Sequence, residues 1–160
     1  MKNEQGFSLV ELLIVVAIIA IIAAIAVPSL LTSRMAANEA SGIEGCRTAA
    51  SAEVAFSSTN NQNYTTLADL VTNNFLDSRY VNAAGFNGYI YTEDTDPGLP
   101  STIPYQIANG GFGIAATAQV GYARFNYGIG PDQVVRYTGH NTSATADPVG
   151  LVAGDPIGKK

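Results

Sequence analysis

The residues with the clearest potential for chemistry are three carboxylates in one short segment, Glu93, Asp94 and Asp96. Carboxylate oxygens are the hard ligands that Ca²⁺ prefers, so this segment is a weak candidate for a calcium site. The segment continues into Asp96-Pro97-Gly98, a sequence typical of a tight turn. We therefore interpret it as an ordinary turn and expect no bound metal.

The sequence holds one cysteine, Cys46, and one histidine, His140. One histidine cannot build a multi-histidine metal site, and one cysteine cannot form a disulfide within the chain. The sequence contains no Ser/His/Asp, Cys/His or phosphate-loop pattern. We expect neither enzymatic activity nor a cofactor. We expect Cys46 to be a buried, unreactive thiol.

The charge of the chain argues against nucleic-acid binding. The formal net charge is −5, and the basic residues cluster only in the terminal pair Lys159-Lys160. Proteins that bind nucleic acid gain much of their affinity from Lys and Arg contacts to phosphates, so we predict no direct nucleic-acid binding.

The apolar residues are concentrated near the N-terminus. Every residue from 12 to 27 is apolar, and the next charge is Arg34. As a helix, residues 7–27 would be roughly 31 Å long, against a hydrocarbon core of about 30 Å. This pattern predicts a single membrane anchor followed by one small polar domain.

Glu11 is the residue that a plain anchor does not explain. A carboxylate at a membrane centre costs about 2.5–3.5 kcal/mol on insertion scales, so such groups usually have a partner and a role. Glu11 lies near one end of the apolar run, which lowers this cost without abolishing it. A side chain with a function is therefore the better interpretation.

Residues 6–20 resemble the class III signal of type IV pilins and type II secretion pseudopilins: Gly6, then Phe7, then Glu11 four residues on, then an unbroken apolar helix. The strong match covers about the first 30 residues, and the remainder is similar in layout alone. In that family a prepilin peptidase cuts after the glycine and methylates the new amine. The resemblance implies cleavage between Gly6 and Phe7, N-methylation of Phe7, and pairing of Glu11 with the N-terminal amine of a neighbouring subunit.

The function that the resemblance implies is that of a major pilin. Such a subunit polymerises through its N-terminal helix into a type IV pilus, used for adhesion, motility or DNA uptake. The implied partners are identical subunits, the prepilin peptidase, the inner-membrane assembly platform and the membrane. We expect the precursor in the inner membrane and the assembled subunit in an extracellular pilus.

Two alternatives stay open at this point. One is a pseudopilin that forms a periplasmic pseudopilus. The lack of an acidic calcium loop near the C-terminus favours the major pilin over this pseudopilin. The other is a membrane-tethered enzyme or binding protein with an ordinary anchor, for which an uncleaved N-terminus is expected.

The helix is expected to continue beyond the apolar run. Pro28 removes a backbone hydrogen bond to the carbonyl of Ala24, which predicts a kink or a locally extended stretch. Further on, spacings of three and four residues predict one buried helical stripe. Its members are Ile43, Cys46, Ala50 and Val54.

The remainder of the chain predicts a small antiparallel sheet. We expect a short helix at residues 65–70 with a threonine cap, ending near residues 73–74. Short alternating segments predict three to five strands; they are residues 88–92, 105–108, 113–119, 123–127 and 133–137. Residues 128–132 would join the last two strands as a hairpin, and the chain after Thr138 is expected to be irregular.

The expected fold is α+β, a long N-terminal helix packed on a small antiparallel sheet, as in the pilin fold. We expect four segments: a leader (residues 1–6), a transmembrane or filament-core helix (7–27), an amphipathic helix (28–59) and a globular headgroup (60–160).

Overall fold

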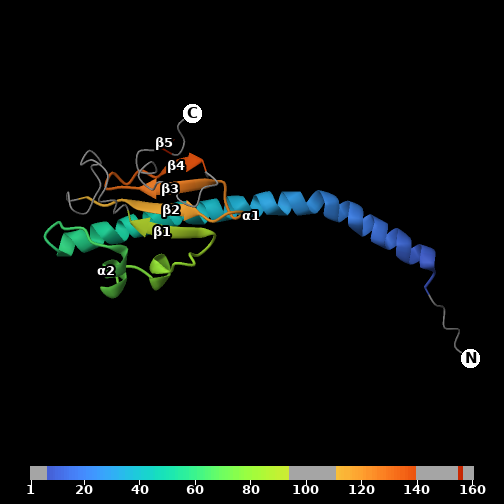
Figure 1. The fold of residues 1–160 in the computed structure, drawn as a ribbon, viewed down its shortest axis with the longest axis horizontal. Coiled ribbons are helices and arrows are strands. Elements are labelled where there is room, and N and C mark those ends of the chain that lie inside the picture. Colours follow the sequence, from blue (N-terminus) through green and yellow to red (C-terminus); the bar gives the residue numbers. More distant parts are fainter. Residues whose placement is uncertain (1–6, 94–110, 140–154, 157–160) are drawn as a thin grey trace, which may run out of the picture. The chain divides into compact units, whose positions relative to one another are not determined.

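The computed structural model describes residues 7–93, 111–139 and 155–156. The chain divides into two compact units, Met1–Arg34 and Met35–Lys160, and each is described by itself. Helix α1, Leu9–Thr59, contributes to both units, and the sheet belongs to the second (Figure 1). The predicted α+β class, with a long N-terminal helix on a small antiparallel sheet, is confirmed.

The first unit is built from the apolar part of α1. All the large apolar side chains between Leu9 and Leu31 are more than half exposed, so this part has no core of its own. The helix runs through Pro28 without a break. The locally extended stretch that was one expectation there is therefore not seen in this single chain, and a kink at Pro28 stays a prediction.

The sheet of the second unit is antiparallel throughout and follows chain order (Figure 1). Its strands are β1 (Tyr89–Glu93), β2 (Ile114–Ala118), β3 (Phe125–Ile129), β4 (Arg136–Gly139) and β5 (Asp155–Pro156). Four of the predicted segments correspond to β1–β4. The fifth predicted segment, residues 105–108, lies outside the described residues.

Two details of the predicted sheet are wrong. The connection between β3 and β4 is residues 130–135, not 128–132, because Gly128 and Ile129 still pair with their neighbours in the ladder. β4 therefore starts at Arg136, three residues after the predicted start. The two-residue β5 was not predicted at all, and it pairs with β4 in the tail that was expected to be irregular.

Two glycines let helix α1 approach the sheet closely. A Cβ on Gly42 would lie 2.8 Å from the Tyr89 ring, and one on Gly45 would lie 1.9 Å from the Tyr91 hydroxyl oxygen. Both tyrosines are buried, and Tyr91 donates a hydrogen bond of 3.4 Å to the carbonyl of Ser41. The close approach explains why small residues occupy this face of the helix.

The buried face of α1 differs in part from the predicted stripe. Cys46 and Ala50 are fully buried, and Ile43 packs half-buried against the core, as expected. Val54 is 44% exposed, so its predicted burial is wrong. The neighbouring Glu53 is buried instead, at 1% exposure, because the Thr65 N–H donates a hydrogen bond to its carboxylate there.

Two short helices follow α1. Helix α2, Leu67–Thr72, begins after Thr66, whose hydroxyl accepts a hydrogen bond from the Asp69 N–H, and it ends at Asn73. The predicted threonine-capped helix is thereby confirmed. The 3-10 helix η1, Ser78–Val81, is capped by Asp77 and was not predicted.

Candidate functional site

The start of helix α1 is a capping box formed by Ser8 and Glu11. The Ser8 N–H donates a hydrogen bond of 2.9 Å to Glu11 Oε2, and the Val10 N–H donates one of 3.3 Å to Ser8 Oγ. This reciprocal pattern satisfies two backbone donors that a helix N-terminus otherwise leaves without partners. The Ser-x-x-Glu spacing was visible in the sequence, but sequence reasoning gave Ser8 no role.

The capping box fixes where the helix begins relative to Phe7. Helix α1 starts at Leu9, so Phe7 precedes it, and the Phe7 side chain is 94% exposed. Glu11 lies in the first turn, where a negative charge interacts favourably with the helix dipole. The structure therefore gives Glu11 a partner within its own chain. Gly6 lies outside the described residues.

The helical part of the first unit offers a continuous apolar surface. Among the described residues, α1 is the one helix long and apolar enough to cross a membrane, and the most apolar part of it is entirely unburied. Exposed apolar surface of this extent indicates a membrane or a protein interface. Membrane insertion is thus consistent with both the length and the composition of the helix.

Two hydroxyl groups shortly after Pro28 are satisfied within the helix. Thr32 Oγ1 donates hydrogen bonds to the carbonyls of Ser29 (2.9 Å) and Pro28 (3.3 Å), and Ser33 Oγ donates to the Ser29 carbonyl (2.9 Å). Such back-bonding hides hydroxyl groups within the helix and often bends it. Thr32 and Ser33 can therefore lie in an apolar environment without exposing unpaired hydroxyls.

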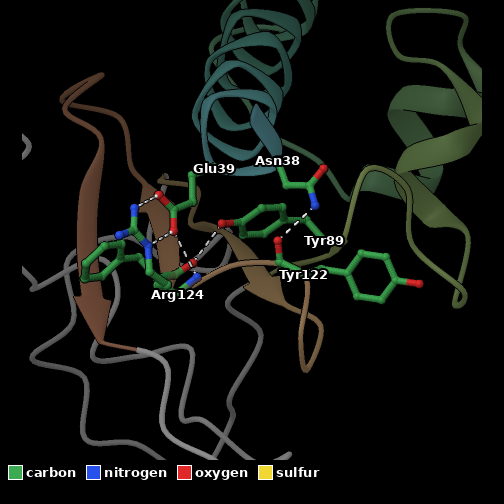
Figure 2. A network of polar contacts seen from close by, with 6 residues as sticks. Asn38, Glu39, Tyr89, Tyr122 and Arg124 are labelled. Atoms are coloured by element: carbon green, nitrogen blue, oxygen red, sulfur yellow. Dashed lines mark hydrogen bonds and ion pairs between the residues drawn. The ribbon is translucent and has the colours of Figure 1, made fainter. Parts of the chain in front are cut away.

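The sheet is fastened to α1 by an ion pair between Glu39 and Arg124. The two guanidinium nitrogens Nε and Nη2 of Arg124 donate to the two Glu39 oxygens at 2.9 Å each, and the Arg124 N–H donates to Oε1 at 3.0 Å (Figure 2). Hydrogen bonds from Arg124 lower the pKa of the buried Glu39 carboxyl. Asn38 extends the contact by donating 2.9 Å to the Tyr122 carbonyl.

Two carboxylates, Glu53 and Glu93, bind the backbone at the start of α2 and just before it. Glu53 Oε2 accepts a hydrogen bond of 3.2 Å from the Thr65 N–H, and Glu93 Oε1 accepts one from the Leu67 N–H. Burial raises the pKa of Glu53 to about 7, and the nearby Glu93 charge adds to the rise. Burial also raises the pKa of Glu93. Sequence reasoning missed Glu53, since a lone carboxylate on a helix is ordinarily exposed.

The weak calcium candidates are only partly described. The Glu93 carboxylate accepts a hydrogen bond from the Leu67 N–H at the start of α2. Asp94 and Asp96 lie outside the described residues. Within the described ranges, no group of three or more His, Cys, Asp or Glu side chains is arranged to hold a metal ion.

Cys46 lies in the core between α1 and the sheet and is fully buried. Burial raises the pKa of its thiol to about 12. A thiol that stays protonated and enclosed is a poor nucleophile and a poor metal ligand. The surroundings of Cys46 therefore agree with the prediction of a buried, unreactive thiol.

Comparison with known proteins agrees with the geometry of the N-terminus. Residues 1–27 match the family model for the prokaryotic N-terminal methylation motif. No curated protein matches the chain. The matched segment contains Gly6, Phe7, the capping box and the apolar helix as far as Val27. The N-terminus of this chain is therefore a class III signal peptide of the kind that type IV pilins and pseudopilins carry.

Proposed function

We propose that the chain is the structural subunit of a type IV pilus, a major pilin that polymerises through helix α1. The observation that carries the proposal is the exposed apolar surface of the first part of α1. This surface follows a helix turn that contains Glu11, and both lie in a segment that matches a processing motif. A plain anchor needs the apolar surface but not the carboxylate. A filament needs both, because helices packed side by side require a feature that sets their register.

Processing would convert this N-terminus into an ion-pair partner. Cleavage between Gly6 and Phe7 by the prepilin peptidase creates a cationic amine at Phe7, which is then methylated. In the filament, the Glu11 carboxylate of one subunit pairs with the Phe7 amine of a neighbour. Few staggers between apolar helices satisfy such a pair, so it selects one register where apolar surfaces alone would slide.

The inner membrane holds the precursor in this proposal, and the pilus carries the mature subunit outside the cell for adhesion, motility or DNA uptake. The assembly platform of the inner membrane adds subunits to the growing filament. A periplasmic pseudopilus would use the same processing and the same helix. The place where the processed chain accumulates distinguishes a pilus from a pseudopilus.

Intact-mass measurement with N-terminal sequencing of sheared surface filaments tests this function. We expect an abundant chain that begins at Phe7 and is heavier by one methyl group. The same processed chain found only in the cell envelope would point to a pseudopilin. An uncleaved chain beginning at Met1 would overturn the proposal.

Two substitutions at Glu11 separate its charge from its capping role. Glu11→Gln keeps an oxygen that can accept from the Ser8 N–H, whereas Glu11→Ala removes the cap as well. If the charge sets the register, both variants lose filaments, because breaking a buried ion pair costs about 3–5 kcal/mol, or at least a hundredfold in subunit association. Normal filament yield from Glu11→Gln would refute the ion-pair role.

A further inference from the structure

The turn between β2 and β3 carries exposed apolar side chains at its tip. Val120 is 77% exposed and Tyr122 is 44% exposed, and Gly121 lies between them with φ of +82°. A Cβ on Gly121 would meet nothing within 4 Å, so the space beside Gly121 is open. The two residues that flank Gly121 therefore expose apolar surface at one short turn.

Several contacts hold this turn against α1 and the start of β1. The Tyr122 carbonyl accepts from Asn38 Nδ2 at 2.9 Å, and Arg124 binds Glu39 just beyond the turn (Figure 2). On the other side, the Gln119 N–H donates 2.8 Å to the Gly88 carbonyl. The apolar tip is thus a supported feature, and its position is fixed with respect to residues 38–39 of the helix.

Chain connectivity keeps residues 38–39 near the end of the apolar helix. The stretch between Glu11 and Arg34 carries no charged residue. It would be about 33 Å long as a helix, close to the thickness of a hydrocarbon core, which places Arg34 in the headgroup layer. Asn38 is four residues further on, and four residues reach at most about 14 Å in any conformation. The turn bound to Asn38 is therefore tethered close to the membrane surface.

The chemistry of the tip fits a lipid headgroup layer. Tyrosine is enriched at membrane interfaces, where its ring meets apolar chains and its hydroxyl meets water. The neighbouring charges of Glu39 and Arg124 neutralise one another, so they do not oppose approach to a lipid surface. We propose that the Val120–Gly121–Tyr122 turn contacts the bilayer surface around the unassembled chain. This inference rests on the proposed function only in requiring that the apolar helix spans a membrane.

The absence of tryptophan from the sequence provides a direct test. Tyr122→Trp and Val120→Trp each introduce one fluorophore into the full chain, which is reconstituted in phosphatidylcholine vesicles containing lipids brominated near the headgroup. Phe75→Trp is the matched control: Phe75 is 38% exposed and packs edge-on against Phe56. Phe56 lies about 27 Å beyond Asn38 along α1.

We expect emission at positions 120 and 122 to shift to shorter wavelength in vesicles and to be quenched several-fold more strongly than at position 75. Equal quenching at the three positions would overturn the proposal. A shift seen only in sheared filaments would also overturn it, because the turn would then contact a second copy of the chain. Circular dichroism shows whether each variant folds. If Tyr122→Trp does not fold, the emission and quenching of Val120→Trp test the proposal.

The outcome is independent of the filament experiment. The vesicle measurement uses the uncleaved full chain, so failed processing or failed assembly in cells does not alter it. Conversely, a turn that stays in water leaves the mass and filament assays of the proposed function unchanged.

Discussion

Replacement of Glu53 by glutamine should change how the stability of the second unit depends on pH. Glu53 is 1% exposed, and burial raises its pKa from 4.5 to about 7. Because the folded-state pKa is raised, the folded chain binds a proton more tightly than the unfolded chain between these two values. Stability is therefore greatest below the unfolded pKa and falls as the pH rises through the folded pKa.

The magnitude follows from the size of the pKa shift. A shift from 4.5 to about 7 corresponds to about 3 kcal/mol at 1.36 kcal/mol per pKa unit. Between pH 5 and pH 8 the loss is about 2.5 kcal/mol, or roughly 10 °C in melting temperature for a domain of this size. The raised pKa of Glu93 acts in the same direction. The lowered pKa values of Glu39 and Asp132 act only at more acidic pH.

The assay is thermal unfolding of the full chain in detergent, followed by the near-ultraviolet circular dichroism of its tyrosines at pH 5, 6, 7 and 8. Glu53→Gln keeps an acceptor for the Thr65 N–H but cannot ionise, so its melting temperature should fall much less across this range. At pH 8 the variant should be the more stable protein. Parallel curves for the two proteins would refute the assignment of the pH dependence to Glu53.

Three further outcomes follow from close contacts. Gly45→Ala should destabilise the second unit by about 1–2 kcal/mol, since overpacking against Tyr91 exceeds the gain in helix propensity, and adding Tyr91→Phe should restore part of the loss in denaturant unfolding. Cys46 should react with maleimide only after unfolding, as mass spectrometry with and without denaturant would show; rapid labelling of the native chain would contradict its burial. Ser8→Ala should speed amide exchange at Val10 several-fold, for a lost cap of about 1 kcal/mol, while Ser8→Thr should not.

Local sequence signals predicted the parts of the fold that depend on neighbours in the chain. The unbroken apolar run predicted the first half of α1, and a threonine cap predicted the start of α2. Short segments of alternating apolar and polar residues, bounded by turn residues, predicted four of the strands. Cys46 was placed in the core correctly because it shares a helical face with small apolar residues.

The errors and omissions depend on contacts between distant residues. Burial of Glu39 requires Arg124, which lies 85 residues away, and no local pattern connects the two. Val54 was placed inside because it is apolar and correctly spaced, but the backbone donor at Thr65 makes the Glu53 position the buried one. The capping box is a different kind of omission, since Ser8 and Glu11 are three residues apart and the signal was local.

The capping role and the proposed pairing role of Glu11 are compatible. A carboxylate has two oxygens and about four acceptor positions, and the Ser8 N–H uses only Oε2. The cap holds the carboxylate at the end of the helix beside Phe7, so an incoming amine meets an acceptor whose position is already set, and little side-chain entropy remains to be lost. Glutamine at position 11 would keep this placement without the charge, and alanine would lose both. The order of filament yields, wild type above Glu11→Gln and Glu11→Gln no lower than Glu11→Ala, therefore measures how much the assembly depends on charge beyond placement.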